Sequence, residues 1–181
     1  MFNSSEELVV LKKISVQCRP WRAPRVIEVN WHPPLYGCIK LNTDGAWKSS
    51  SNKADYGGVF CDYSGKVMGA FSSNLDIPSS VAAEVMVVIK AIELASEREW
   101  KHIWLEVDSE LVLSFLRSST LVPWQLNVEW RNCLYQISQI NFYSSHIFRE
   151  GNKVADALVN EGIKSSGLTW CDHLPPHFVI S

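Results

Sequence analysis

Four acidic side chains that are far apart in the sequence each fall where a predicted strand ends or a predicted helix begins. They are Asp44, Glu84, Asp108 and Asp156. If folding brings such carboxylates together, they repel one another and resist ionisation, and a divalent cation removes that conflict. Mg²⁺ and Mn²⁺ are hard ions that prefer oxygen ligands, so they suit this donor set. The four acids therefore predict a metal site, although Asp44-Gly45 taken alone is more typical of an ordinary turn.

Two of the acids depend on predicted strands. Residues 39–44 alternate apolar and polar side chains, which is the pattern of a half-buried strand, and Gly45 allows a sharp exit after Asp44. Residues 103–108 predict another strand that ends on an acid, Asp108. If the two strands are parallel neighbours, both carboxylates lie at one edge of the sheet, where sites of helix-connected sheets form.

The other two acids depend on predicted helices. Ser79 and Ser80 can cap a helix that ends before Trp100 and carries Glu84 in its first turn, and Asp156 lies in the first turn of a helix predicted from 153 to 164. The remaining predicted elements are a hairpin over 56–61 and 66–71, a helix from Ser109 to Leu116, a helix that begins at Pro123, and a strand over 141–148. This order predicts an α/β fold whose five-stranded mixed sheet has three antiparallel strands, then parallel strands, with helices on both faces.

Length and composition suit one domain, since the chain has 181 residues of which 46% are hydrophobic. We expect an N-terminal extension or linker over 1–37, a single domain over 38–166 and a tail over 167–181. No apolar run could span a membrane, and residues 1–10 lack a basic start, so we expect an intracellular monomer, nuclear or cytoplasmic and not secreted. The five cysteines are far apart, which argues against a disulfide framework and a zinc site.

The charge of the chain does not by itself indicate a nucleic-acid partner. The formal net charge is −2, whereas nucleic-acid-binding domains usually carry a basic excess or patch. Five basic residues with no acid among them do lie between Lys12 and Arg25. That run is either a solvated tail or a contact for nucleic acid.

Four motifs occur in order along the chain. They are Asn42-Thr43-Asp44-Gly45-Ala46, Ala83-Glu84, Val107-Asp108-Ser109, and the run from His146 to Asp156 that includes Arg149-Glu150-Gly151-Asn152. Together they resemble the successive motifs of type 1 ribonuclease H. The stretches 40–46 and 149–158 are more closely similar to the plant, retroelement-derived, reverse-transcriptase-like branch of that family. The likeness covers about residues 38–166 and implies a ribonuclease H-like fold.

The resemblance also implies a reaction and a set of site residues. Asp44, Glu84, Asp108 and Asp156 would hold two Mg²⁺ ions, with Mn²⁺ as an alternative. One ion would activate water and the other would stabilise the leaving oxygen as the RNA strand of an RNA–DNA hybrid is cut, leaving a 3′-hydroxyl and a 5′-phosphate. His146 would assist proton transfer or product release, whereas a lone histidine at a strand end is usually a surface residue. The residues implied to bind substrate are Asn42, Gly45, Ser109 and Asn152.

Two departures from the family pattern weaken the expected grip on a duplex. The region between Asp108 and His146 has no protrusion rich in Lys and Arg, and Glu110 stands where many members carry Gln. Duplex binding depends largely on neutralising phosphates, so both features lower the expected affinity.

Two other functions are alternatives to the nuclease. A related 3′–5′ exonuclease would carry Asp-x-Glu on the first strand, but Ala46 stands at that place. A domesticated, non-catalytic module that binds nucleic acid or protein remains an alternative. Of the tryptophans, we expect Trp104 and Trp130 to serve packing, and Trp47 to lie nearest to a nucleic acid.

Overall fold

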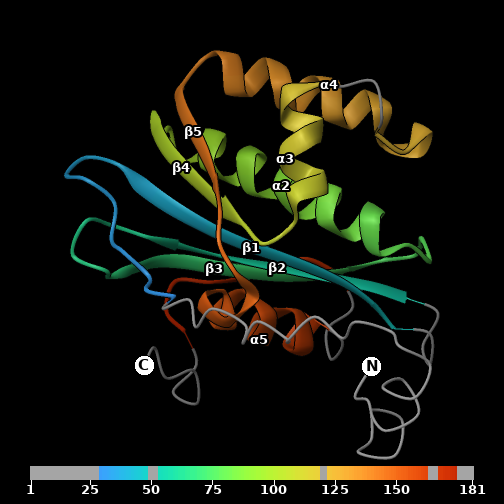
Figure 1. Cartoon of the computed structure of the whole chain (residues 1–181), viewed down its shortest axis with the longest axis horizontal. Helices are drawn as coiled ribbons and strands as arrows, with labels where there is room; N and C mark the ends of the chain where they lie inside the picture. Colours follow the sequence, from blue (N-terminus) through green and yellow to red (C-terminus); the bar gives the residue numbers. More distant parts are fainter. Residues whose placement is uncertain (1–28, 49–52, 119–121, 163–166, 175–181) are drawn as a thin grey trace, which may run out of the picture.

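A computed structural model describes residues 29–48, 53–118, 122–162 and 167–174. Its centre is a six-stranded mixed sheet in the order β5-β4-β1-β2-β3-β6 (Figure 1). The strands are β1 (Ile39–Lys48), β2 (Lys53–Cys61), β3 (Val67–Leu75), β4 (His102–Val107), β5 (Asn141–His146) and β6 (Thr169–Cys171). The helices are α2 (Ser80–Glu97), α3 (Glu110–Arg117), α4 (Asn127–Ser138) and α5 (Lys153–Gly162), with short 3₁₀ turns η2 (Trp124–Leu126) and η3 (Arg149–Gly151).

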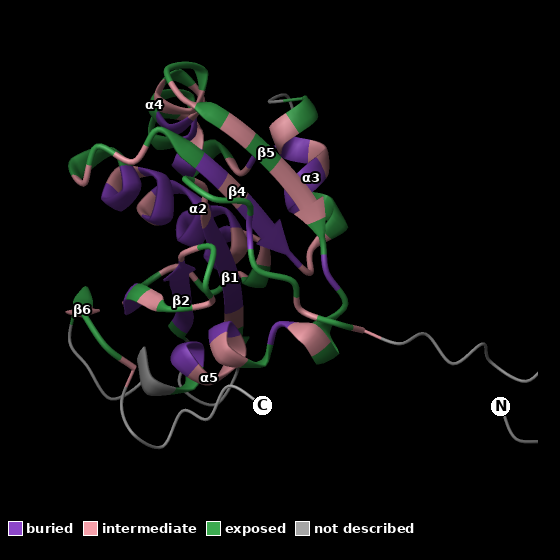
Figure 2. Cartoon of the chain, turned by 90° about the vertical axis from the view of Figure 1, so that its left-hand side faces the viewer, coloured by how far each residue is buried: buried purple, intermediate pink, exposed green. Residues whose placement is uncertain are grey.

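Helices cover both faces of the sheet, which confirms the expected fold class. α2, α3 and α4 lie on one face and α5 lies on the other (Figure 1). The main core is on the first face, where Leu41 and Leu105 of the sheet cluster with Val88 and Ile92 of α2. A smaller cluster joins β2 and β3 to Leu158 of α5. Figure 2 shows α2 and the central strands largely buried between these layers.

Serine caps begin α2 and α3. The Ser79 hydroxyl accepts a hydrogen bond from the Ala82 amide at 3.2 Å, and the Ser109 hydroxyl accepts one from the Val112 amide at 3.4 Å. These bonds satisfy donors that a helix start leaves without intrahelical partners. Both caps were predicted from the sequence.

β1 is a central strand that joins the antiparallel part of the sheet to the parallel part. It runs antiparallel to β2 and parallel to β4, with Thr43 opposite Val107. β4 in turn runs parallel to β5, with Val107 opposite His146. The predicted parallel pairing is therefore confirmed, but the predicted end of the strand is wrong. β1 does not exit at Gly45; it continues through Lys48 because β2 pairs along its whole length.

The segment expected to be a tail contributes the sixth strand. β6 pairs antiparallel with β3, with Trp170 opposite Phe71. The Trp170 ring covers Gly69 so closely that a Cβ at that position would lie 2.0 Å from a ring atom. Gly69 therefore makes room for the ring, and the expected five-stranded sheet is corrected to six strands. Residues 175–181 of the expected tail lie outside the described residues.

Part of the segment expected to be a linker packs on the domain. We call residues 29–34 the strap. The Trp31 ring packs on the cluster beside α5, and its Nε1–H donates to Asn42 Oδ1 at 3.0 Å. The His32 carbonyl accepts a hydrogen bond from Lys40 Nζ at 2.8 Å. The strap thus extends the domain toward the N-terminus beyond the expected boundary at 38, while the basic run from Lys12 to Arg25 lies outside the described residues.

Two further findings bear on the broad class of the protein. The four described cysteines, Cys38, Cys61, Cys133 and Cys171, are free thiols. Within the described ranges, no helix combines the length and apolar character that crossing a bilayer requires.

Candidate active site

The first two acids lie side by side at one edge of the sheet. Asp44 and Asp108 directly follow Thr43 and Val107, which are partners across the parallel β1–β4 pair. Asp44 is buried within β1, opposite Gly57 of β2, and Asp108 is half-buried just after β4. Parallel register is what sets the two carboxylates on neighbouring strands at the same level.

A close contact of β1 with α2 sets the third acid beside them. A Cβ added to Gly45 would lie 2.6 Å from the backbone carbon of Ala83 and 2.7 Å from the backbone nitrogen of Glu84. Only a glycine permits this approach, so Gly45 serves helix–strand packing. Glu84 lies just beyond the first turn of α2, which contains no acid, rather than within that turn as predicted.

The fourth acid reaches the site from the opposite face of the sheet. Asp156 lies in the first turn of α5, as predicted, and its Oδ1 is 3.2 Å from Nη2 of Arg149 in η3. The start of α5 is fixed to β1, because Asn152 Nδ2 donates to the Thr43 carbonyl at 2.8 Å. Thr43 immediately precedes Asp44, so this bond ties the fourth acid's helix to the first acid's strand.

The acidities show that these carboxylates act on one another. Burial raises the pKa of Asp44 to about 6, and the charges of Asp108 and Asp156 add to the rise. Burial likewise raises the pKa of Glu84 to about 7, with further contributions from Asp108 and Asp44, while a hydrogen bond from Ser109 opposes the rise. The pKa of Asp108 is also raised, chiefly by burial. Elements from both faces of the sheet therefore deliver the four acids to one electrostatic cluster.

Arg149 is the cation of this cluster, and sequence reasoning missed it. Its charge lowers the pKa values of Asp44, Glu84 and Asp108, in opposition to their burial. Its own pKa is raised, first by its hydrogen bond to Asp156 and then by the charge of Asp44. The available signal was its place in the same motif as Asp156, seven residues earlier.

The donor set suits Mg²⁺ or Mn²⁺, because all four groups offer carboxylate oxygens. Asp44 Oδ2 is buried and has no hydrogen-bond partner among the described residues, which is a position that a cation would satisfy. In the same described part of the chain, no three His, Cys, Asp or Glu side chains are arranged to hold a metal ion. Two of the acids have other partners instead, Asp156 with Arg149 and Glu84 with Ser109.

His146 lies next to Asp108 at the exposed end of β5. Its Nε2 is 3.1 Å from the Asp108 carbonyl oxygen, and since a carbonyl only accepts, this nitrogen must carry the proton in that contact. The imidazole also meets the Phe148 ring edge to face, with centroids 5.4 Å apart. His146 is thus at the site, as expected, and exposed enough to meet a ligand.

The expectation that two asparagines bind substrate is not supported by their surroundings. Asn42 and Asn152 are 4% and 2% exposed. Asn42 accepts from Trp31 and donates to Glu106 and to Asn152, and Asn152 itself donates to Thr43. These bonds employ the side-chain oxygen and nitrogen of both amides inside the protein, so both side chains serve the structure, and their contact with a substrate stays a prediction. Gly45 packs against α2, and Ser109 caps α3 and contacts Glu84.

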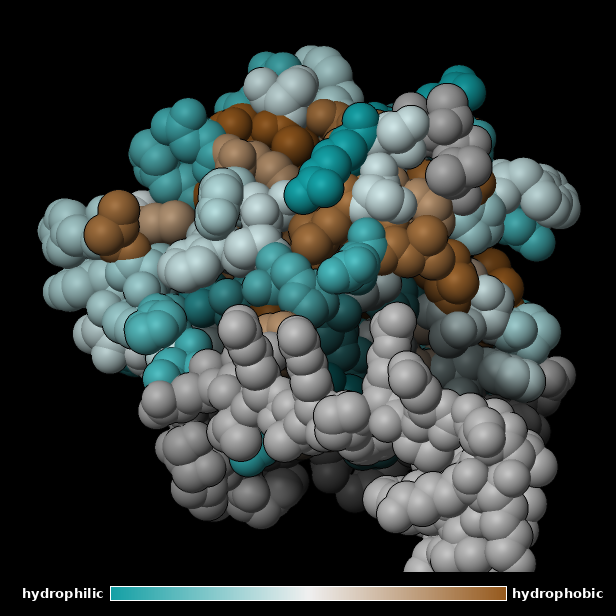
Figure 3. Space-filling model, viewed as in Figure 1, coloured by the Kyte–Doolittle hydropathy of each residue, from teal (hydrophilic) through white to brown (hydrophobic). Residues whose placement is uncertain are grey.

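The predicted packing role of Trp130 is confirmed, whereas the proximity of Trp47 to a nucleic acid stays a prediction. Trp130 is buried in the main core, and the Trp104 ring lies over Lys40 Nζ at 4.1 Å. Trp47 is 41% exposed near the end of β1. In Figure 3, which has the view of Figure 1, hydrophilic side chains gather at the centre of the face, below hydrophobic ones over the helical layer.

The raised pKa values predict how stability depends on pH when metal is absent. The pKa values of Asp44 and Glu84 rise from 3.8 and 4.5 to about 6 and 7, so the folded state binds protons more tightly than the unfolded chain. The tighter proton binding by Asp44 and Glu84 stabilises the folded state fully below about pH 4, and this stabilisation is lost as the pH rises to about 7. In a chelator, Glu84→Gln should therefore gain melting temperature relative to wild type by about 5 °C between pH 4 and 7.

The measurement is a series of melting curves at constant ionic strength. Glu129→Gln is the matched control, because Glu129 is exposed on α4, away from the cluster. Its melting temperature should follow that of wild type across the range. Parallel curves for Glu84→Gln and wild type would contradict the electrostatic cluster.

Comparison with known proteins gives a consistent result. The family model for reverse transcriptase-like proteins matches residues 42–162. A protein of Arabidopsis thaliana, provisionally named a ribonuclease H protein, is 34% identical over 140 residues. That match covers 76% of this chain but only 22% of the relative, so the chain spans about a fifth of the relative's length.

Three solved structures are similar over about 70% of this chain. RNase H1 of Halobacterium salinarum is 25% identical, with a TM-score of 0.60, and the match covers 98% of its chain. An RNase H1 isolated from compost and solved in complex with an RNA/DNA hybrid is 26% identical, with a TM-score of 0.60 and 96% of its chain covered. The N-terminal RNase H domain of a Mycobacterium tuberculosis protein, with 94% of its chain covered, has a TM-score of 0.62 at 20% identity and supports the fold alone.

Proposed function

The chain belongs to the reverse transcriptase-like family and has a ribonuclease H-like fold, and from that premise we propose that it cleaves the RNA strand of RNA–DNA hybrids as a metal-dependent endonuclease. The observation that carries this proposal is the cluster of four acids, in which one buried Asp44 oxygen has no hydrogen-bond partner within the part of the chain that the structure describes. The RNase H1 solved with a bound RNA/DNA hybrid supports the substrate class. The proposal concerns this domain, because the chain spans only part of its Arabidopsis relative.

In this proposal the four acids hold the cations. Asp44 and Asp108 supply ligands from the sheet edge, Glu84 from α2, and Asp156 from α5. The bound Mg²⁺ or Mn²⁺ ions supply an activated water and stabilise the leaving oxygen. The chain's own contribution is to bring four mutually repelling carboxylates to one region on rigid elements. For all four to reach the ions, the Asp156 and Glu84 side chains must leave their present partners, Arg149 and Ser109.

Two exposed side chains complete the proposed site. His146 is an exposed residue whose Nε2 lies beside the Asp108 carbonyl, and it can hold or release a proton at that nitrogen. Arg149 can donate to a phosphate oxygen of the incoming strand, since its guanidinium is 69% exposed and lies at the acids. Both groups act on the substrate side of the acids, whereas Asn42 and Asn152 act behind them.

The test is cleavage of an end-labelled RNA–DNA hybrid by the full chain. We expect cuts within the RNA strand in Mg²⁺ or Mn²⁺, products with a 3′-hydroxyl and a 5′-phosphate, and no cuts in a chelator. Single-stranded RNA and duplex DNA of the same sequence are the matched substrates and should stay whole. A hybrid that stays whole in both metals would refute the nuclease.

One observation favours the second candidate, a non-catalytic binding module. Residues 110–145 carry only two basic side chains, Arg117 and Arg131, so this region offers little charge with which to hold a duplex for cutting. The same assay distinguishes the candidates, because a module would bind the hybrid or a protein partner and leave the RNA intact at every metal concentration.

A further inference from the structure

A buried lysine lies behind the acids, on the face of the sheet that the strap covers. Lys40 of β1 is 1% exposed and lies between two rings, with Nζ 4.7 Å from the Trp31 centroid and 4.1 Å from that of Trp104. Nζ forms an ion pair with Glu106 at 2.8 Å and donates to the His32 carbonyl at 2.8 Å. A buried charge is costly unless it is paired and hydrogen-bonded, and here it is both.

The buried pair continues into a network of amides. Glu106 Oε2 accepts from Asn42 Nδ2 at 3.0 Å, and the same Nδ2 lies 3.3 Å from Asn152 Oδ1. Trp31 Nε1, which can only donate, lies 3.0 Å from Asn42 Oδ1. A donor on one side and a carboxylate on the other fix the orientation of the Asn42 amide, so that its nitrogen faces Asn152.

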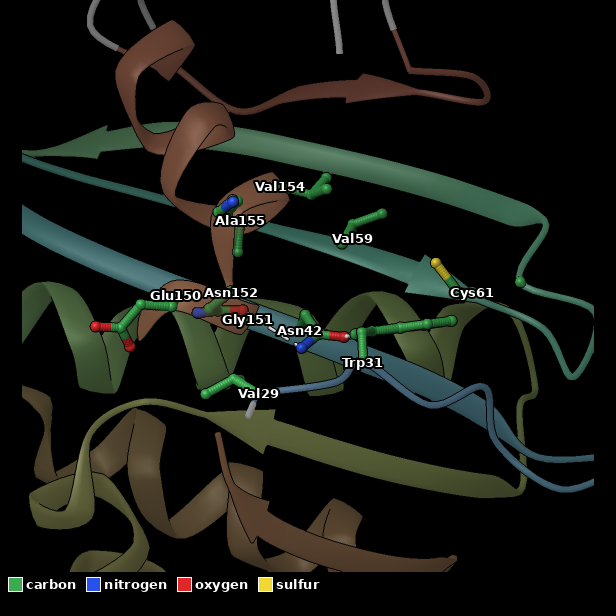
Figure 4. A pocket seen from close by; sticks show the side chains of 12 residues that line it. Val29, Trp31, Asn42, Val59, Cys61, Glu150, Gly151, Asn152, Val154 and Ala155 are labelled. Atoms are coloured by element: carbon green, nitrogen blue, oxygen red, sulfur yellow. Dashed lines mark hydrogen bonds between the residues drawn. The ribbon is translucent and has the colours of Figure 1, made fainter. Parts of the chain in front are cut away.

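The network ends on the backbone beside Asp44 and on the backbone of Asp156. Asn152 Nδ2 donates to the carbonyl of Thr43, the residue before Asp44, at 2.8 Å. The Asn152 carbonyl accepts from the backbone amide of Asp156 at 3.1 Å, in the first turn of α5. Figure 4 shows Trp31 beside Asn42, with Asn152 next to Asn42 at the start of α5.

A cavity separates part of the strap from α5. The hydrogen bonds from Trp31 through Asn42 to Asn152 therefore form an important connection between the strap and the start of α5. A cavity of about 190 Å³ is lined by Trp31 of the strap, Val59 of β2 and Val154 of α5 (Figure 4). Val29 of the strap lies close to Gly151 of η3, where an added Cβ would lie 2.7 Å from the valine side chain.

We propose that the strap is a positioning element of the metal site: through Trp31, Asn42 and Asn152 it holds the start of α5, and with it Asp156, against β1 and Asp44. The strap lies before residue 42, where the match to the family model begins, so the shared family region does not include it. The inference rests on the proposed function in one respect, which is that the four acids bind metal.

The test is Trp31→Phe, with Trp104→Phe as its matched control. Both variants keep a ring over Lys40 and remove one indole N–H, but the Trp104 Nε1–H donates to Ser145 at 2.7 Å, outside the network. Losing the Trp31 donor leaves Asn42 Oδ1 without its partner, and such a loss is worth about three- to tenfold in an equilibrium. In the full chain, we expect hydrogen exchange of the amides at 152–156 to be about three- to tenfold faster in Trp31→Phe, and Mn²⁺ affinity by calorimetry to fall by a similar factor.

Trp104→Phe should change neither quantity by more than about twofold. A second variant, Asn152→Ala, should have the same effects, and combining it with Trp31→Phe should add little, because both changes break one network. Equal effects from Trp31→Phe and Trp104→Phe, or a lower melting temperature with unchanged exchange at 152–156, would overturn the proposal. So would faster exchange with unchanged Mn²⁺ affinity. If wild type cuts no hybrid but both shifts appear, the proposed function fails and the positioning role of the strap holds.

Discussion

Asp108→Asn is expected to reduce hybrid cleavage to background while the fold stays intact. Asp108 follows the β4 residue paired with Thr43, so its carboxylate stands beside that of Asp44. The amide has nearly the same size but is a poor ligand for a hard cation, so metal binding weakens without a cavity being opened. Because the variant removes one charge from a repelling cluster, its melting temperature in a chelator should equal or exceed that of wild type.

His146→Ala is the variant with which Asp108→Asn is compared, and we expect it to slow hybrid cleavage without abolishing it. Removal of a general acid or base typically slows a reaction by roughly 10² to 10⁴ and leaves a measurable remainder. Single-turnover rates on one hybrid in Mg²⁺, together with melting curves in a chelator, measure both variants. Cleavage by Asp108→Asn at the wild-type rate would place the chemistry elsewhere, and a wild-type rate for His146→Ala would return that histidine to an ordinary surface role.

Gly45→Ala is expected to be the most destabilising small substitution in the strand. The added methyl group would lie 2.6 Å and 2.9 Å from the carbon and oxygen of Ala83 and 2.7 Å from the Glu84 nitrogen. All three are backbone atoms, so no side-chain rotation relieves the clash, and β1 must separate from α2. We expect a loss of about 3 kcal/mol or more in unfolding free energy, which corresponds to a fall of about 6 to 12 °C in melting temperature.

Gly37→Ala is the matched control for the change of residue type. Gly37 has a positive φ of 79° but nothing within 4 Å of an added Cβ. Its substitution therefore costs only the strain of a left-handed backbone, about 1 to 2 kcal/mol. Thermal melts of both variants separate clash from strain, and a Gly45→Ala protein that is no less stable than Gly37→Ala would show that the helix–strand contact is looser than described.

Local patterns carried most of the fold prediction because they reflect local physics. Ser79 and Ser109 were identifiable as caps since their bonds reach only three residues along the chain. The order of strands and helices predicted parallel strands after the antiparallel ones, but that β1 and β4 are parallel neighbours was only a condition of the argument, which the structure meets. The four acids were found through their places at element ends and through a family resemblance, and no local pattern alone identified them.

What sequence reasoning missed depends on contacts between distant segments. Lys40 looks like the outward-facing member of an alternating strand, and it is buried only because Trp31, Trp104 and Glu106 surround it. β6 has only three residues, too few for any periodic signal. The continuation of β1 past Asp44 was not predicted because Asp-Gly is typical of a turn. Here Gly45 instead stays within the strand and allows α2 to pack closely on it.

Because β6 is the last strand in the chain, one edge of the sheet stays unpaired until late in synthesis. β6 covers the outer edge of β3, and Arg98 from the end of α2 stacks on its Trp170 at 3.5 Å. Every other strand of the sheet precedes β6 in the chain, so a growing polypeptide that has completed α5 still presents the β3 edge with unpaired backbone groups. An open edge of this kind is a template for pairing with another chain. During synthesis this edge of β3 is therefore covered only after residues 169–171 have emerged from the ribosome.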